Sequence, residues 1–221
     1  MEQTARERAL VHVPAVPRPG YALVKRVLDI TVSGFLLVLL SPLLLLAGLA
    51  IFIDSGLPIL YSGERVGLSG RPIRVHKFRS MRDGSHHHLE ELLTADEELR
   101  LEYGERRKLR EDPRRTPVGA LLRRTSLDEL PQLLNVLVGE MSLVGPRPYF
   151  PREMTERPEA VEILAVRPGI TGLWQVNGRS DRTFEERLAY DLEYVQARSL
   201  WLDVRIMFRT IGAVISGRGA Y

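Results

Sequence analysis

The chain of 221 residues contains no cysteine. This absence excludes a disulfide framework, a thiolate nucleophile and a metal site built from thiolates. The sequence also lacks internal repeats, and its length suits one sizeable domain or a domain with an anchor. The chain therefore has to carry its chemistry on oxygen and nitrogen groups.

The chain also has little net charge, +3 with a pI near 9.4. A mildly basic balance is compatible with phosphate-bearing partners or an anionic membrane surface. We predict no nucleic-acid partner. The mean hydropathy of -0.09 hides one long apolar stretch within an otherwise charged chain.

That stretch, residues 30–53, contains no charged residue over 24 positions. As a straight helix it would measure about 36 Å, enough to cross a hydrocarbon core of about 30 Å. Residues 1–20, with several arginines and a cluster of prolines, are predicted to be a flexible leader. A signal peptide is disfavoured, because the apolar run is too long and no small-residue cleavage site follows it.

Two topologies remain open for residues 21–56. Ser41 and Pro42 lie at the midpoint of the run, where proline removes a backbone hydrogen bond and favours a kink. Basic residues flank the run on both sides, which favours a re-entrant hairpin with both flanks on the cytoplasmic side. A single kinked crossing is the alternative. A re-entrant hairpin is slightly preferred.

Lys25, Arg26 and Asp29 precede the apolar run at helical spacing. This spacing predicts a local ion pair, and we expect the three residues to anchor the helix at headgroup level. An ordinary solvated helix turn is the alternative.

Residues 57–221 are predicted to form a separate domain that begins with a β-hairpin of residues 59–62 and 73–78. Lys77 and Arg79 alternate with Phe78 on the second strand, which predicts both cations on one face. They are candidate phosphate contacts, with a solvated strand face as the alternative. Residues 83–112 form a charged helical insertion, whose three adjacent histidines, 86–88, are interpreted as surface linker rather than a metal site.

The segment 126–148 carries the strongest chemical signal. Asp128 and Glu129 are adjacent carboxylates, two arginines lie just upstream at positions 123 and 124, and Arg147 follows in a rigid Gly-Pro-Arg-Pro turn. Arginine binds phosphate through a bidentate fork, and Mg²⁺ takes one or two carboxylates together with substrate phosphates. The pattern therefore indicates phosphoryl chemistry.

A structural interpretation of the same residues is a helix capping box formed by Ser126 and Glu129. Pro131 conflicts with it, because its missing N–H would fall inside a helix capped at Ser126. A helix that begins near Pro131 would leave Asp128 on the preceding turn.

The C-terminal part contributes weaker candidates. Glycine-rich turns surround a strand-like TGLWQV, and Gln175 and Arg179 supply hydrogen-bonding groups there. Residues 183–198 form an amphipathic helix with Asp191 near its apolar face. Residues 200–216 are predicted to lie at a membrane interface, with a core helix of the domain as the alternative.

Several of these motifs, in this order, resemble the bacterial sugar transferase family, the monotopic phosphoglycosyl transferases. The resemblance extends from about residue 21 to the C-terminus and rests on KRVLDI (25–30), the Ser41-Pro42 break, HKFRSM (76–81), RRTSLDELPQLLNVLVGEMSLVGPRP (123–148), RPGITGLWQVNGRS (167–180) and DLEYV (191–195).

The resemblance implies an α+β fold: a membrane re-entrant helix hairpin hinged at Ser41-Pro42, plus a mainly helical cytoplasmic catalytic domain with a small β-hairpin and interfacial amphipathic helices. It implies that Asp128 is the nucleophile and a Mg²⁺ ligand, with Glu129 as its partner. The insertion and the GRGAY ending resemble those of members related to undecaprenyl-phosphate galactose or glucose phosphotransferases.

The implied reaction moves a hexose 1-phosphate from a UDP-hexose to undecaprenyl phosphate at the cytoplasmic face of a bacterial inner membrane. Such a step would begin exopolysaccharide, capsule or O-antigen synthesis. A direct transfer without a covalent intermediate is one alternative, and a non-catalytic, membrane-anchored assembly protein is another. The sugar, the pathway and the oligomeric state, including a homo-oligomer, stay open.

Overall fold

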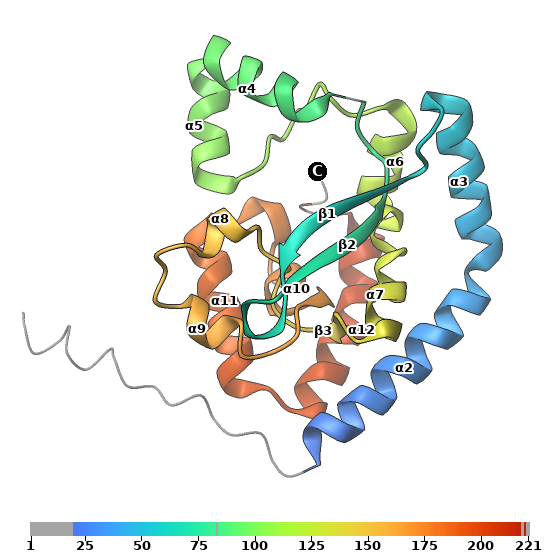
Figure 1. The fold of residues 1–221 in the computed structure, drawn as a ribbon, viewed down its shortest axis with the longest axis vertical. Coiled ribbons are helices and arrows are strands. Elements are labelled where there is room, and N and C mark those ends of the chain that lie inside the picture. The colour runs from blue at the N-terminus through green and yellow to red at the C-terminus, as the bar shows by residue number, and fades with distance from the viewer. Residues whose placement is uncertain (1–19, 83, 218, 220–221) are drawn as a thin grey trace, which may run out of the picture.

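The computed structural model describes residues 20–82, 84–217 and 219. The predicted leader, apart from Gly20, lies outside this range. The described elements, in chain order, are α2 (Tyr21–Leu39), α3 (Ser41–Ser55), β1 (Leu60–Val66), β2 (Pro72–Phe78), α4 (Ser85–Ala95), α5 (Glu97–Arg106), α6 (Pro117–Thr125), α7 (Gln132–Val138), β3 (Ser142–Val144), α8 (Pro151–Met154), α9 (Ala160–Ile163), β4 (Gly169–Thr171), α10 (Leu173–Val176), α11 (Phe184–Ala197) and α12 (Leu200–Ser216). The predicted mainly helical α+β fold is confirmed (Figure 1).

Helices α2 and α3 form a bent pair along one side of the molecule (Figure 1), with 62° between their axes. The break falls at Leu40, directly before Ser41 and Pro42. Pro42 has no N–H with which to bond the carbonyl of Val38, and the Ser41 hydroxyl donates to that oxygen instead, at 2.8 Å. Within the described residues no single helix has the length and apolarity to cross a membrane, but the bent pair together does.

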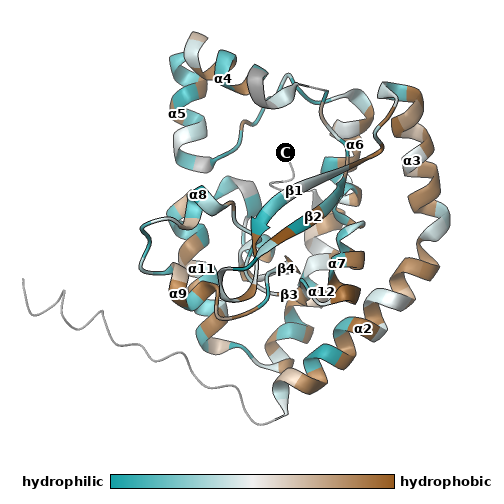
Figure 2. Ribbon diagram, viewed as in Figure 1, coloured by the Kyte–Doolittle hydropathy of each residue, from teal (hydrophilic) through white to brown (hydrophobic). Residues whose placement is uncertain are grey.

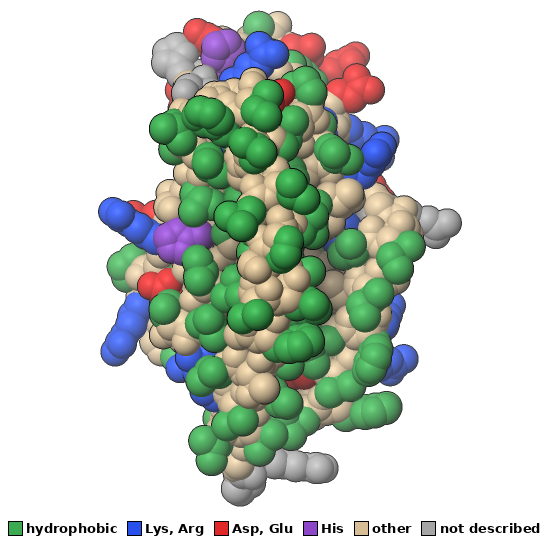
Figure 3. Space-filling view, turned by 90° about the vertical axis from the view of Figure 1, so that its right-hand side faces the viewer, with side chains coloured by type: hydrophobic (Ala, Val, Ile, Leu, Met, Phe, Trp, Pro, Cys, Tyr) green, Lys and Arg blue, Asp and Glu red, His purple; other side chains and the backbone are tan. Residues whose placement is uncertain are grey.

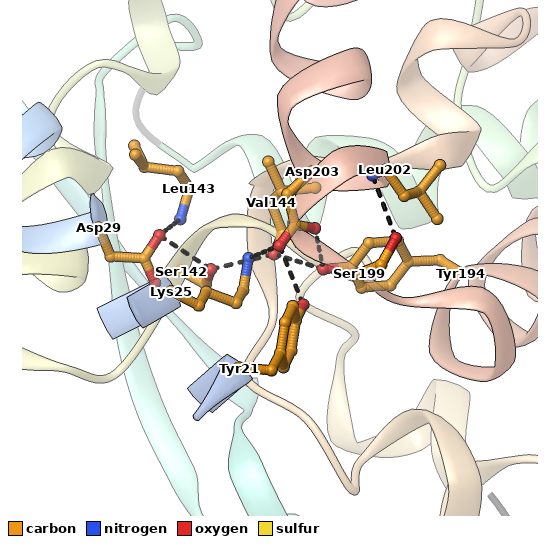
Figure 4. Close-up of polar contacts among 10 residues, drawn as sticks. All are labelled: Tyr21, Lys25, Asp29, Ser142, Leu143, Val144, Tyr194, Ser199, Leu202 and Asp203. Carbon is orange, nitrogen blue, oxygen red and sulfur yellow. Dashed lines mark hydrogen bonds and ion pairs between the residues drawn. The ribbon is translucent and has the colours of Figure 1, made fainter. Parts of the chain in front are cut away.

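The first half of α2 is tied to the domain by the three residues of the KRVLDI motif. Asp29 is 4% exposed and accepts hydrogen bonds from the Leu143 amide at 3.0 Å and the Ser142 hydroxyl at 3.1 Å (Figure 4). Arg26 donates to the carbonyls of Val136 and of its neighbour at position 137, which end α7. Cations at a helix C-terminus satisfy carbonyls that have no partner inside the helix.

The predicted local ion pair is wrong, because Lys25 pairs with Asp203 of α12 at 2.9 Å. The same carboxylate accepts from the hydroxyls of Tyr21 at 2.9 Å and Tyr194 at 2.7 Å (Figure 4). Helical spacing permitted a contact with Asp29, but that carboxylate accepts hydrogen bonds from Ser142 and Leu143, while the equally buried Asp203 accepts from Lys25. The motif therefore joins α2 to α7, β3 and α12.

The predicted β-hairpin is present, with β1 and β2 antiparallel in the register Tyr61 to Lys77 and Gly63 to Val75. The first strand extends four residues beyond its predicted end, to Val66. The inner face of β2 contributes Val75 to the main core, where side chains from α7, β3, α10, α11 and α12 also meet. The hairpin therefore packs against the same core as α7, β3, α10, α11 and α12.

A second, parallel pair of strands was not predicted. β3 and β4 pair through Ser142 with Gly169 and Val144 with Thr171. A Cβ on Gly169 would lie only 2.1 Å from the amide nitrogen of Gly145, so glycine is required for this approach. The pairing ends β3 immediately before the Gly-Pro-Arg-Pro turn. The predicted strand-like TGLWQV is wrong beyond Thr171, because the next residues form helix α10.

The predicted charged insertion forms the helices α4 and α5, which stand at one end of the molecule and are mainly hydrophilic (Figures 1 and 2). Asp96 caps α5 by accepting from the amides of residues 98 and 99. The side chains of His86 and His87 lie outside the described residues.

One face of the molecule is strongly apolar (Figure 3). Along α2 and α3, Val38, Leu45 and Ile53 are each at least 75% exposed. On α12, Asp203 and Ile206 point into the protein, whereas other large apolar side chains are exposed, namely Trp201, Phe208, Ile211 and Ile215. Exposed patches of this extent mark membrane or protein contact surfaces. The interfacial position of α12 stays a prediction.

The Lys25–Asp203 contact generates a stability prediction. Asp203→Asn should lower the melting temperature of the detergent-solubilised protein by roughly 6 °C, because it leaves the partly buried Lys25 ammonium group without its counter-charge, a loss of about 2 kcal/mol. Differential scanning fluorimetry is the measurement, with Glu193→Gln on the exposed side of α11 as the control. A variant that melts with the wild type would show that the contact does not stabilise the fold.

Candidate active site

The adjacent carboxylates lie on a single 3-10 turn, Leu127–Glu129, between α6 and α7. Helix α7 begins at Gln132, after Pro131, so Asp128 lies on the preceding turn, as one of the two interpretations predicted. The capping-box interpretation is wrong: the Ser126 side chain caps neither neighbouring helix, and its hydroxyl accepts from Arg179 Nη2 at 3.0 Å. The carboxylates are therefore not used to cap a helix.

The two carboxylates have different environments. Asp128 is only 7% exposed, and burial raises the pKa of its carboxyl, with a further rise from the charge of Glu129. Glu129 pairs with Lys77 Nζ at 2.6 Å. Burial alone would raise the pKa of Glu129, but the charge and the hydrogen bond of Lys77 lower it below the ordinary value. Lys77 thus keeps Glu129 ionised beside a desolvated Asp128.

Helix α6 carries Arg123, whose charge interacts with that of Asp128. The helix is capped by Thr116, whose hydroxyl accepts from the Gly119 amide at 3.0 Å. A Cβ on Gly119 would lie 2.1 Å from the Ser80 carbonyl oxygen, so this glycine lets α6 lie against the chain that follows β2. Arg123 then donates to the Ser80 hydroxyl at 2.9 Å. Burial lowers the pKa of Arg123, while the charge of Asp128 acts to raise it.

Arg179, on the turn after α10, lies near Asp128 and Glu129, which together are called the dyad below. Its interaction with both carboxylates works against the lowering of its pKa by burial. Nη2 bonds Ser126, while Nη1 is buried and has no hydrogen-bond partner among the described residues. A buried donor without a partner is costly unless a ligand supplies an acceptor. Arg179 is thus a candidate for binding an anion beside Asp128.

Arg147 is held by the helix α11. Asp191 is fully buried and accepts from the Arg147 amide at 3.2 Å and from the Tyr149 hydroxyl at 2.6 Å. Burial raises the pKa of Asp191 to about 7, although these hydrogen bonds oppose the rise. Asp191 therefore orients the Gly-Pro-Arg-Pro turn through backbone and tyrosine contacts.

Three cations gather around the indole of Trp174, a side chain that is 4% exposed. Arg187 Cζ lies 4.4 Å from the ring centroid, Arg147 Cζ 5.5 Å and Lys108 Nζ 6.0 Å. Arginine and lysine are attracted to the face of an aromatic ring at these distances. This cluster extends the positive charge beyond the residues next to the dyad.

Two other predicted site residues, Arg79 and Gln175, donate hydrogen bonds to backbone carbonyls. Arg79 is 7% exposed and donates to the carbonyls of residues 55, 56 and 57, where α3 ends. Its placement favours a role in holding the end of α3 over contact with phosphate, and it does not meet Lys77 at one site as expected. Gln175 donates to the Ile170 carbonyl at 3.3 Å, while its buried Oε1 has no partner among the described residues.

Sequence reasoning missed Trp174, Arg187 and Lys108. Arg187 had a detectable signal, because it lies three residues after Phe184 and four residues before Asp191, on the buried face of α11. An arginine at such a position is rarely buried without a function or a partner. Lys108 had no local signal, since it belongs to a highly charged insertion.

The site therefore combines a buried carboxylate with several cations drawn from separate elements. A comparison with protein families matches residues 20–217 of the chain to the family described as bacterial sugar transferase. The chain belongs to the bacterial sugar transferase family. The predicted resemblance is confirmed.

Individual relatives of this family member are similar over most of its length. The UDP-galactose-lipid carrier transferase of Erwinia amylovora is 46% identical over 89% of the chain and 41% of that protein. The exopolysaccharide production protein ExoY of Sinorhizobium fredii is 45% identical over 92% of the chain and 91% of that protein. The undecaprenyl-phosphate galactose phosphotransferase of Salmonella typhimurium is 44% identical over 89% of the chain and 41% of that protein. The chain thus spans about two fifths of two of these relatives and nine tenths of ExoY.

The coupling of the two carboxylates generates a pH prediction for this sugar transferase. We predict that the ionised form of Asp128 is the reactive one, so that its raised pKa should make activity fall at a higher pH than for an ordinary aspartate. Glu129→Gln removes a neighbouring negative charge, so the pKa of Asp128 falls. The acid limb of the kcat/KM profile should move to lower pH by about one unit.

The matched control for this profile is Glu193→Gln, which removes a carboxylate from an exposed position on α11. Its acid limb should coincide with that of the wild type. An acid limb in Glu129→Gln that stays in place, or moves to higher pH, would contradict the assigned coupling.

Proposed function

We propose that the protein is a phosphoglycosyl transferase that moves a hexose 1-phosphate from a UDP-hexose to undecaprenyl phosphate. The observation that carries the proposal is the buried Asp128 carboxylate, which is surrounded by the charges of Lys77, Arg123 and Lys108. The three relatives named above support the choice of donor and acceptor through their names, which refer to UDP-galactose, a lipid carrier, undecaprenyl phosphate and exopolysaccharide.

The first step is an attack by an Asp128 carboxylate oxygen on the phosphorus that bears the sugar. The phosphoanhydride bond breaks, UMP leaves with the electron pair, and an acyl phosphate that carries the sugar remains on Asp128. Both reactants are anions, so their repulsion has to be offset. Arg123, Arg179 and Lys77 lie where they can stabilise charge on the transferring phosphoryl group.

In the second step a phosphate oxygen of undecaprenyl phosphate attacks the same phosphorus. The acyl phosphate bond breaks, Asp128 is regenerated as a carboxylate, and the product is a lipid diphosphate sugar. Glu129 stays ionised because Lys77 lowers its pKa. Two sequential displacements at one carboxylate predict ping-pong kinetics. A direct transfer to the acceptor would instead require both substrates on the enzyme at once.

The donor set of the dyad fits a Mg²⁺ ion. Asp128 is buried and its pKa is raised by the adjacent Glu129, a repulsion that a bound divalent cation relieves. Among the described residues no group of three or more acidic or histidine side chains is gathered for a metal, so the remaining ligands would be substrate phosphate oxygens and water. When bound, Mg²⁺ would supply charge stabilisation at the diphosphate.

The bent pair of α2 and α3 would place this site at the membrane surface. The acceptor phosphate is carried by a lipid and lies at the headgroup plane, so the catalytic carboxylate has to be held at that depth. The exposed apolar side chains of the pair would enter the hydrocarbon region, with both ends of the hairpin on the cytoplasmic side of a bacterial inner membrane.

The proposed nucleophile generates the first prediction of this section. Protein in nanodiscs, quenched after incubation with UDP-hexose and Mg²⁺ but without acceptor, should gain the mass of one hexose phosphate on the peptide that contains Asp128. Asp128→Asn should gain none and should lose essentially all transfer of labelled sugar phosphate to undecaprenyl phosphate, because an amide is not a nucleophile here.

The control for this experiment is Glu193→Gln, which changes an exposed carboxylate on α11. It should keep both the adduct and the transfer. Undiminished transfer by Asp128→Asn would remove the proposed nucleophile, and transfer without any adduct would favour direct displacement. Absence of both transfer and adduct in the wild type, with every UDP-hexose tested, would favour the non-catalytic assembly protein.

The re-entrant topology generates a second prediction, which the natural absence of cysteine makes simple to test. Single cysteines at Ala15 and Ser69 should both resist a membrane-impermeant maleimide in intact cells and both react after permeabilisation. A cysteine at Leu40, in the bend, serves as the control and should react poorly in both conditions. Labelling of Ala15 and Ser69 from opposite sides would show a true crossing.

A further inference from the structure

The segment that follows α5 returns to the catalytic site. Arg107 Cζ lies 5.9 Å from the ring centroid of Phe184, Lys108 Nζ lies 6.0 Å from that of Trp174, and Leu109 is only 2% exposed. Three consecutive side chains therefore contact α10, α11 and the protein interior. Figure 1 shows the insertion helices at one end of the molecule, with the chain after α5 running back towards α6. The insertion is thus attached to the site through this segment.

Lys108 adds a cation to a region that is already positive. It shares the Trp174 ring with Arg147 at 5.5 Å and Arg187 at 4.4 Å. Burial lowers the pKa of Lys108, and the charges of Arg147 and Arg123 lower it further. Like charges that are held together in a partly desolvated region are stabilised by a polyanion that lies between them.

The same lysine lies within electrostatic reach of the dyad. The positive charges of Lys77 and Lys108 both act to lower the pKa of Glu129, and both oppose the rise in the pKa of Asp128. Lys108 therefore belongs to the cluster around Trp174, and its charge also acts on the two adjacent carboxylates. Trp174 Nε1 is a buried donor without a hydrogen-bond partner among the described residues, which adds a group that an acceptor oxygen could satisfy.

We propose that Lys108 binds the diphosphate of the nucleotide-sugar donor, which makes the insertion of residues 83–112 a part of the donor site. The inference rests on the proposed function. A diphosphate carries two adjacent anionic groups and can bridge from the dyad to the cations around Trp174. A phosphate monoester such as that of the lipid acceptor presents one such group, so the donor matches the extent of the cluster better.

The test measures donor binding separately from catalysis. Isothermal titration calorimetry of the detergent-solubilised full chain with UDP and Mg²⁺ gives the affinity of wild type, Lys108→Ala, Lys108→Arg and Arg110→Ala. Loss of a charge-assisted hydrogen bond should weaken UDP binding by Lys108→Ala about tenfold or more. Lys108→Arg keeps the positive charge and should recover most of the affinity. Arg110 is exposed two residues along the chain and serves as the matched control.

A second arm distinguishes the donor from the acceptor. The KM for a short-chain polyprenyl phosphate, measured at saturating donor, should change less than twofold in Lys108→Ala. Unchanged UDP affinity in Lys108→Ala, or a loss confined to the polyprenyl phosphate KM, would overturn the inference while leaving the proposed function intact. Equal losses in Lys108→Ala and Lys108→Arg would also overturn it, because they would indicate a packing defect.

The same measurements separate failure of this inference from failure of the proposed function. A wild-type protein that binds no UDP would overturn both. A wild-type protein that binds UDP but forms no sugar-phosphate adduct on Asp128 would overturn the proposed nucleophile, while a tenfold weaker UDP affinity of Lys108→Ala would still support the role of Lys108.

Discussion

The repulsion between two adjacent carboxylates is the constraint on which the rest of this structure depends. Asp128 and Glu129 lie on one short turn, and the first of them is removed from water. An uncompensated pair of this kind would be strongly destabilising, so the surrounding elements have to supply opposite charge. The chain meets this requirement from four directions, with Lys77 on β2, Arg123 on α6 and the more distant cations of the insertion and of the turn after α10.

This arrangement also explains why the bent helix pair is joined so firmly to the domain. The buried Asp29 holds α2 against β3, whose last residue leads directly into the turn that carries Arg147. The end of α3 is held by Arg79, which follows the strand that carries Lys77. Arg147 therefore lies close along the chain to the contact that holds α2, and Lys77 lies close to the contact that holds the end of α3. These contacts fix the apolar helices relative to the site.

Features that depend on a few neighbouring residues were accessible from the sequence. The break before Pro42, the β-hairpin and the turn that carries Asp128 all follow from local backbone chemistry, and the structure has each of them. Apart from TGLWQV, of which residues 173–176 form helix α10, the features that failed concern interaction partners. Lys25 was paired with Asp29 because helical spacing allows that contact, whereas its partner Asp203 lies 178 residues further along the chain. No local pattern carries that information.

The sequence by itself determined the family, the apolar helix pair with its break and the identity of the adjacent carboxylates, because each is written in contiguous motifs. Only the tertiary structure decided which cations surround Asp128, that Arg79 holds a helix end, that Asp191 orients the turn of Arg147, and that Lys108 reaches the site from the insertion. The physical reason is that charge compensation acts through space. Its strength depends on distance and burial, and both are set by how distant segments pack together.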